Sequence, residues 1–132
     1  MTHVVVYLIV AIVVVVVVTG RRGHGARLDP RRIFSLSERT SGFIRAGNQC
    51  EHFNVFGRRC TNAPTHGDHH YPHSKGGATS MSNFVALCAR HNLTKGSKIP
   101  SVIATRRLER RRRGYFPPGT PVEIIGRQPS RR

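Results

Sequence analysis

The fold is decided by the stretch DHHYPHSKGG (residues 68–77), followed by Asn83 and by CARHNLTKG (residues 88–96). This stretch places an Asp-His pair, a double-glycine turn, an asparagine and candidate metal ligands within 29 residues. Metal-assisted hydrolysis of a phosphodiester needs a base that activates water and oxygen donors that hold a divalent ion. The ordered combination therefore indicates this chemistry far more strongly than any one of its residues does alone.

The local pattern around this stretch predicts a strand, a loop, a second strand and a short helix. The strands are expected at residues 67–71 and 84–87, with a loop turned by Gly76-Gly77 between them and a helix from Cys88 to about Lys95. Upstream, Ser35-Leu36-Ser37-Glu38 is a capping-box pattern that opens a helix reaching about Ala46. Downstream, residues 101–113 read as a very basic helix that Gly114 ends, and the proline-containing tail 115–132 is expected to be extended or partly disordered.

The expected hydrophobic core is thin for a chain of this length, so a metal ion is expected to add stability. On the upstream helix, Leu36, Phe43 and Ile44 are expected to point inward. The full set is Phe34, Leu36, Phe43, Ile44, Phe53, Phe56, Phe84, Val85, Leu87, Ile99, Val102 and Ile103.

The chain resembles the HNH endonuclease family. The resemblance rests on Asp68-His69-x-x-Pro72-x-Ser74-x-Gly76-Gly77, then Asn83, then Leu87-Cys88-x-x-His91-Asn92-x-x-Lys95-Gly96, and with the upstream cysteines and helix it extends over about residues 33–100. Two positions depart from the usual pattern: His91 stands where a second cysteine is common, and Asn92 stands where the last histidine can stand, as in a His-Asn-Asn variant. The resemblance implies an α+β fold, the small ββα-metal (His-Me finger) HNH domain.

The resemblance also implies the roles of the site residues. His69 is the expected catalytic base, because a neutral imidazole accepts a proton near pH 7, and His70 is the alternative. Asp68 is the strand neighbour of His69, so simple alternation would point it to the opposite face; the resemblance implies that both reach the metal region. Asp68 and Asn92 are expected to hold one catalytic ion, Mg²⁺ or Mn²⁺, because both are oxygen donors. Asn83 is expected to fix the loop through backbone hydrogen bonds and so to orient His69.

A second metal site is expected at Cys50, Cys60, Cys88 and His91. Four soft or borderline ligands suit a structural, tetrahedral Zn²⁺. Cys88 and His91 are three residues apart and share one face of a helical turn. Cys50 and Cys60 are ten residues apart, which is longer than the usual spacing, so His52 is kept as the alternative to Cys60.

The charge of the chain favours a polyanionic partner. The formal net charge is +16, and arginine supplies 19 of the 22 basic residues. Such a surface favours nucleic acid first and anionic lipid second. The candidate nucleic-acid-binding residues are Lys75, Lys95, Arg106, Arg107, Arg110, Arg111, Arg112 and Arg113.

The N-terminal segment is expected to be a single-pass membrane anchor. Val4–Val18 carries no charge, and with its neighbours it approaches the length that a helix needs to cross the hydrocarbon layer. The arginines that follow it mark the C-terminal side as cytoplasmic. The expected organisation is an anchor at residues 1–20, a basic linker at 21–32, the nuclease domain with its basic C-terminal helix at 33–114, and a Pro/Arg-rich tail at 115–132.

The sequence therefore predicts a membrane-anchored HNH endonuclease that faces the cytoplasm and cuts DNA with a divalent ion. One alternative is a zinc-stabilised nucleic-acid-binding module that is tethered to the membrane and lacks catalysis. Another is a membrane-tethered interaction protein whose basic tail contacts lipid.

Overall fold

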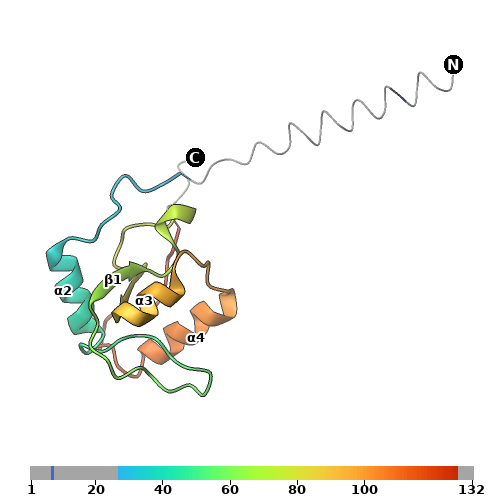
Figure 1. Cartoon of the computed structure of the whole chain (residues 1–132). Helices are drawn as coiled ribbons and strands as arrows, with labels where there is room; N and C mark the ends of the chain where they lie inside the picture. The colour runs from blue at the N-terminus through green and yellow to red at the C-terminus, as the bar shows by residue number, and fades with distance from the viewer. Residues whose placement is uncertain (1–6, 8–26, 128–132) are drawn as a thin grey trace.

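The structure is a computed structural model that describes Tyr7 and residues 27–127. The element order is α2 (Leu36–Arg45), β1 (His66–His69), the 3₁₀ turn η1 (His73–Lys75), β2 (Phe84–Leu87), α3 (Ala89–Lys95) and α4 (Val102–Arg112) (Figure 1). The described residues contain no helix that is long and apolar enough to cross a membrane. The anchor expected at residues 1–20 lies outside the described residues, apart from Tyr7.

A two-stranded antiparallel hairpin forms the centre of the domain. β1 pairs with β2 so that Asp68 lies opposite Val85 and His69 opposite Phe84. Successive side chains of a strand point to opposite faces, and all four residues of β2 are buried. The hairpin therefore has two covered faces, and the expected strand-loop-strand-helix order is confirmed.

Each face of the hairpin carries its own hydrophobic cluster. On one face, Phe84 and Ala86 pack with Phe34 and Ala46, which flank α2. On the other face, Val85 and Leu87 pack with Cys50, Cys88 and with Leu108 of α4. Figure 1 shows α2 and α4 on opposite sides of β1 and β2, with α3 crossing the hairpin.

The helix α2 begins with the predicted capping box. The Ser35 side chain accepts a hydrogen bond from the Glu38 amide, and the Glu38 carboxylate accepts one from the Ser35 amide. The helix packs on the hairpin through small residues, because Gly42 and Ala46 allow the Phe84 ring to approach closely. A Cβ atom at Gly42 would lie 2.3 Å from Phe84 Cε1, which is shorter than any normal contact.

Half of the expected core residues are exposed instead. Leu36 and Ile44 of α2 are on the outside, because the close approach at Gly42 turns the helix about its axis so that they face away from Phe84. The prediction was wrong for Leu36, Ile44, Phe56, Ile99, Val102 and Ile103, which are all exposed. Their places in the core are taken by Ala46, Leu108 and Phe116, together with the buried cysteines Cys50 and Cys88.

The helix α4 buries one of its arginines. Arg112 follows Leu108 by four residues, so the two side chains share a helix face, and that face meets the hairpin. Arg112 Nε lies 2.8 Å from Glu51 Oε1, and both side chains are 1% exposed. Arg112 also donates to the Phe84 carbonyl oxygen, and the Tyr115 hydroxyl donates to Glu51 Oε1.

Residues 115–127 of the tail are packed against the domain. Phe116 is buried, with the Arg45 and Arg112 guanidinium groups 4.8 Å and 4.9 Å from its ring centroid. Farther along, the Ala78 amide donates to the Gly126 carbonyl oxygen, and Gly77 forms a β-bridge with Arg127. The tail thus covers the loop between η1 and β2.

Candidate functional site

The expected base and the expected ligands of the catalytic ion line one open groove, with a volume of about 940 Å³. β1 contributes Asp68 and His69, and α3 contributes Asn92 to this catalytic groove. His73 lies at the end of the loop beyond β1, and its ring centroid is 5.5 Å from that of His69. Asp68 and His69 reach the same groove although they are strand neighbours, which the resemblance implied and simple strand alternation did not.

A threonine holds the His69 ring in place. Thr79 Oγ1 lies 2.9 Å from His69 Nε2, and it also donates a hydrogen bond to the Arg31 carbonyl oxygen. A hydroxyl carries only one proton, which the carbonyl oxygen takes here, so the bond to the imidazole must be donated by Nε2–H. The proton of the neutral ring is thereby assigned to Nε2, and Nδ1 carries the lone pair.

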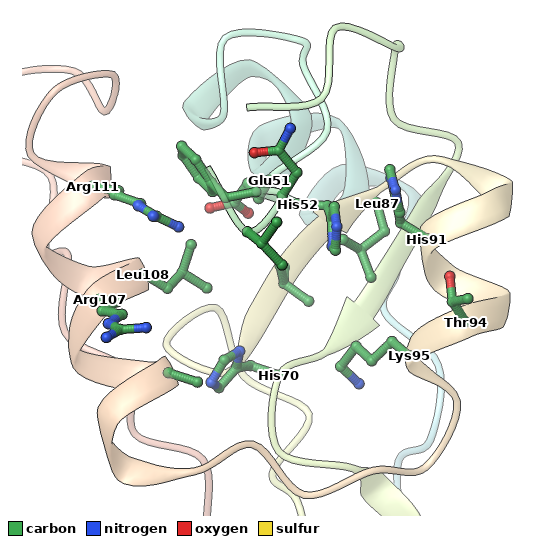
Figure 2. A pocket seen from close by; sticks show the side chains of 15 residues that line it. Glu51, His52, His70, Leu87, His91, Thr94, Lys95, Arg107, Leu108 and Arg111 are labelled. Carbon is green, nitrogen blue, oxygen red and sulfur yellow. The ribbon is translucent and has the colours of Figure 1, made fainter. Parts of the chain in front are cut away.

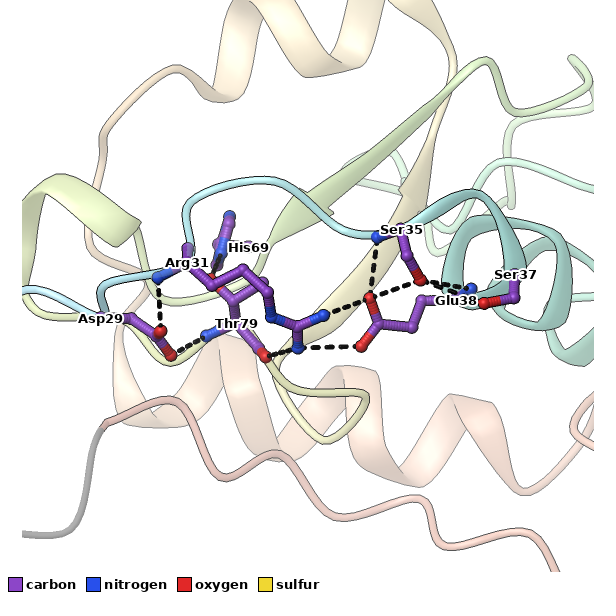
Figure 3. Close-up of polar contacts among 7 residues, drawn as sticks. All are labelled: Asp29, Arg31, Ser35, Ser37, Glu38, His69 and Thr79. Carbon is purple, nitrogen blue, oxygen red and sulfur yellow. Dashed lines mark hydrogen bonds and ion pairs between the residues drawn. The ribbon is translucent and has the colours of Figure 1, made fainter.

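The chain before α2 forms a strap that fixes Thr79 (Figure 3). The Asp29 carboxylate accepts hydrogen bonds from the backbone amides of Thr79 and Arg31. The Arg31 guanidinium donates to both carboxylate oxygens of Glu38 and to the Thr79 carbonyl oxygen. This strap, residues 29–31 at the end of the expected linker, is therefore hydrogen-bonded to the loop between η1 and β2 that carries Thr79.

The surroundings keep His69 neutral. Burial lowers the pKa of His69 below its usual range, and the nearby Asp68 carboxylate offsets this only in part. Phe34 contributes to the burial, with its ring centroid 4.6 Å from that of the imidazole. A neutral imidazole with a fixed tautomer is suited to accept a proton at pH 7.

The Asp68 carboxylate already contacts a cation of the protein. Lys95 Nζ lies 2.8 Å from Asp68 Oδ2, and both side chains are partly buried. Lys95 was expected to bind nucleic acid, and the structure instead shows its ammonium group at the carboxylate expected to bind the catalytic ion. Carboxylate and amide oxygens are ligands that Mg²⁺ and Mn²⁺ prefer, so Asp68 and Asn92 suit such an ion at this groove.

Asn83 makes the backbone hydrogen bonds that were expected of it. Its Oδ1 accepts from the Tyr71 amide at 2.8 Å, and its Nδ2 donates to the carbonyl oxygens of Tyr71 and Ala78 at 3.0 Å and 2.8 Å. The residue is fully buried. Asn83 therefore ties the two ends of the loop together next to His69.

His70, the alternative base, points away from the catalytic groove. Its Nε2 lies 2.9 Å from Thr105 Oγ1 of α4, and it lines a different groove, between α3 and α4. Burial, with smaller contributions from Arg112 and Lys95, lowers the pKa of His70 to about 4. The geometry favours His69 over His70.

Cys50, Cys60, Cys88 and His91 converge on one point. Their ligand atoms all lie within 4.8 Å of one another, and His91 Nδ1 is 3.2 Å from Cys88 Sγ and 3.5 Å from Cys50 Sγ. Tetrahedral zinc with Zn–S bonds of about 2.3 Å and Zn–N bonds of about 2.0 Å places its ligand atoms roughly 3.5 Å apart. This Cys₃His cluster is therefore compatible with a metal ion and suggests zinc.

The chemistry of the cluster also calls for a cation. Burial raises the pKa of the Cys50 thiol to about 11, so a thiolate there needs a positive charge beside it. Burial lowers the pKa of His91, which keeps the ring neutral as a metal ligand must be. His52, the alternative ligand, stacks on the His91 ring at a centroid distance of 3.8 Å, while Cys60 completes the cluster.

The candidate nucleic-acid-binding residues other than Lys95 fall into three groups. Lys75, Arg106, Arg107, Arg110 and Arg113 are exposed and stay candidates. Arg111 is half-buried, with its guanidinium 4.2 Å from the centroid of the Phe53 ring. The expectation is wrong for Arg112, because its side chain is buried in the ion pair with Glu51 and a phosphate cannot reach it.

Sequence reasoning missed Thr79, Asp29 and Arg31. Their contacts span 48 to 50 residues along the chain, and no local spacing signals such contacts. Arg112 did carry a signal, because it lies one helical turn after Leu108, the one leucine of a basic helix.

Comparison with known proteins agrees with this geometry. Residues 50–98 match the family model of the HNH endonuclease. No curated protein and no solved structure matches the chain. The matched range contains the Cys₃His cluster, His69, Asn83 and Asn92, while the strap and α4 lie outside it. This chain therefore carries an HNH endonuclease domain over residues 50–98.

Proposed function

We propose that the protein is a metal-dependent endonuclease that hydrolyses phosphodiester bonds of DNA. The observation that carries the proposal is the convergence of Asp68, His69 and Asn92 on one open groove within the HNH domain. The strongly basic composition fits a polyanionic substrate.

In this proposal His69 activates the attacking water. The lone pair on Nδ1 accepts a proton from the water as its oxygen bonds to phosphorus, and the phosphorus–oxygen bond to the leaving strand breaks. Thr79 holds Nε2–H, so the ring cannot exchange its proton between the two nitrogens without losing a buried hydrogen bond. Asn83 supports this geometry by closing the loop that carries Thr79.

A Mg²⁺ or Mn²⁺ ion held by Asp68 and Asn92 would polarise the phosphate and stabilise the leaving oxygen. Because Lys95 contacts Asp68 Oδ2, a divalent ion would bind through Oδ1 or take the place of the ammonium group. Zn²⁺ at the Cys₃His cluster would have a structural role. His91 directly precedes Asn92 on α3, so a metal bound to Cys50, Cys60, Cys88 and His91 would fix the helix that presents Asn92 to the groove.

A plasmid-nicking assay tests the proposal. The full-length chain, kept in solution with a non-ionic detergent, is incubated with supercoiled DNA and Mg²⁺ or Mn²⁺, and again with EDTA. General-base catalysis contributes roughly 10²–10⁴-fold, so His69→Ala should reduce the rate by at least 100-fold. His66→Ala is the matched control, because His66 is an exposed histidine of β1 at the same groove.

The same assay separates the runner-up function, a nucleic-acid-binding module without catalysis. The ion pair between Lys95 and Asp68 favours that reading, because a protein cation occupies the carboxylate. A folded, zinc-containing protein that binds DNA but cuts with no divalent ion would establish the binding module and refute the enzyme.

We also propose that residues 1–20 anchor the domain in the cell membrane, with the domain in the cytoplasm. The support is the uncharged run Val4–Val18 followed by arginines. Labelling of a cysteine substituted at position 25 in intact cells tests this topology. Reaction of that cysteine with a label added outside the cell would refute it.

A further inference from the structure

A second groove lies on the other side of α3. This α3–α4 groove has a volume of about 460 Å³, and Figure 2 shows the side chains that line it. The helix α3 separates the two grooves, because Asn92, Leu93 and Gly96 line the catalytic groove, whereas His91, Thr94 and Lys95 line the α3–α4 groove.

The floor of the α3–α4 groove is apolar. Its apolar lining residues are Val85 and Leu87 of β2, Leu108 of α4 and Phe53, which packs against them. The His52 and His91 rings, which stack on each other, stand at the border of the floor. Such a floor can cover the flat face of a base or the carbon face of a sugar.

The rim of the groove is cationic. Arg107 and Arg111 reach into it from α4 and Lys95 from α3, as Figure 2 shows. The position of the Arg111 guanidinium over the Phe53 ring restrains that side chain. The Asp68 carboxylate restrains Lys95 from the catalytic side. Arg111 and Lys95 are thus placed before a ligand arrives, which reduces the entropy lost on binding.

The acidic residue that lines the groove offers no counter-charge to this rim. Glu51 Oε1 accepts from Arg112 and Tyr115, and Oε2 accepts from Arg112 and from the Ala86 amide. Its side chain is 1% exposed. Because Lys95 is paired with Asp68, the positive charge left to face solvent in the groove is that of Arg107 and Arg111, and the partner that fits it is anionic.

We propose that the α3–α4 groove binds a nucleotide of the nucleic-acid strand that the catalytic groove cuts. Arg107 and Arg111 contact a phosphate of the backbone, and the apolar floor receives the sugar or base next to it. Arginine forks suit phosphate oxygens, and a floor of this kind suits a nucleotide better than a bare inorganic anion. This inference rests on the proposed nuclease function and adds to it a second contact that positions the strand across α3.

The helix α4 provides its own control. Arg107 and Arg111 are four residues apart and share the face that lines the groove. Arg110 of α4 and Arg113 at the C-cap of α4 are exposed and line neither the α3–α4 groove nor the catalytic groove. The double substitutions Arg107→Gln/Arg111→Gln and Arg110→Gln/Arg113→Gln remove the same charge from the same element.

The test measures DNA affinity of the full-length variants in non-ionic detergent by fluorescence anisotropy. A labelled duplex and a labelled single strand are titrated in EDTA, which prevents cutting, over a range of salt concentrations. The groove pair, Arg107→Gln/Arg111→Gln, should bind DNA at least tenfold more weakly than the wild type. The number of counterions released on binding, read from the salt dependence of the affinity, should fall by about two. The control pair, Arg110→Gln/Arg113→Gln, removes two exposed cations that also stay candidates for backbone contact, so it should lose some affinity, but at least threefold less than the groove pair. Equal losses in both pairs, or no loss in the groove pair, would overturn the inference.

A second measurement needs no substitution. In NMR spectra of the wild-type chain, a short thymidine oligonucleotide should shift the Nε–H signals of Arg107 and Arg111 more than those of Arg110 and Arg113. Equal shifts at all four arginines, or no shift at Arg107 and Arg111, would contradict the inference.

Vesicle binding and plasmid cutting distinguish a failure of this inference from a failure of the proposed function. If the groove pair loses binding to phosphatidylserine vesicles but keeps its affinity for DNA, the groove serves lipid and the inference is wrong. If the wild-type chain cuts plasmid but both arginine pairs lose the same DNA affinity, the proposed role of the groove is wrong and the nuclease function stands. A wild-type chain that neither binds nor cuts nucleic acid would refute the proposed function as well.

Discussion

The hydroxyl of Thr79 is the contact through which the strap acts on His69, and Thr79→Val removes it while keeping the shape of the side chain. The substitution leaves His69 Nε2–H and the Arg31 carbonyl oxygen without the partner they have now. The imidazole can then place its proton on either nitrogen, and it is free to turn. We expect catalysis to fall more than DNA binding does.

The magnitude follows from these two lost contacts. Each buried polar group left without a partner costs about 1–3 kcal/mol, so the loss of both contacts should lower the free energy of unfolding by about 2–6 kcal/mol. A general base contributes roughly 10²–10⁴-fold to a rate, and a base held in the wrong tautomer loses much of that. The expected effect is a 10- to 100-fold lower kcat, with KM changed less than threefold.

The assay is the initial rate of plasmid nicking at saturating and limiting DNA, together with ¹⁵N NMR of the His69 ring, which reports the position of the proton. Thr79→Ser restores the hydroxyl and should recover kcat to within about threefold of the wild type. Thr105→Val is the matched control, because Thr105 Oγ1 lies 2.9 Å from Nε2 of His70 in the other groove. It removes one contact instead of two, so it should lower stability by about 1–3 kcal/mol and leave kcat unchanged.

Two results would refute this reasoning. One is a wild-type spectrum with the proton on Nδ1 of His69. The other is a folded Thr79→Val protein that cuts as fast as the wild type.

Three further predictions concern stability. Structural zinc sites contribute about 10–16 kcal/mol of apparent binding energy, which exceeds the whole stability of a small domain. Removal of zinc by a chelator should therefore abolish cooperative thermal unfolding, and added Zn²⁺ but not Mg²⁺ should restore it. An unchanged calorimetric transition after chelation would contradict a metal at the Cys₃His cluster. Arg112→Met leaves the buried Glu51 carboxylate without its cation and should lower the free energy of unfolding, measured by urea denaturation, by about 3–5 kcal/mol. The double variant Glu51→Gln/Arg112→Met should recover much of that loss. A loss below about 1 kcal/mol in Arg112→Met would argue against the buried ion pair. Gly42→Ala places Cβ 2.3 Å from Phe84 Cε1, so it should lower the free energy of unfolding by about 1–3 kcal/mol despite the better helix propensity of alanine. The matched control is Ser41→Ala at the neighbouring exposed position, which should change the free energy of unfolding by less than about 0.5 kcal/mol.

Local signals in the sequence determined the elements and the ligand sets. The capping box at Ser35 and Glu38 specifies the start of α2, because both of its hydrogen bonds close within three residues. The turn at Gly76 needs a positive φ, here 90°, which glycine adopts without strain. The spacing of Cys88 and His91 places two ligands on one helical turn. Each of these interactions joins residues that are close in the chain, so residue type and spacing were enough to find it.

Only the tertiary structure decided which face of each helix is buried and what orients the base. Gly42 packs under Phe84, and so the larger Leu36 and Ile44 remain outside, against the hydrophobic pattern. Arg112 is buried because Glu51, 61 residues earlier, neutralises it. The relay from Arg31 through Thr79 to His69 spans 48 residues between its first two members. Such pairings depend on how the chain folds back on itself, and residue type at either end does not name its partner.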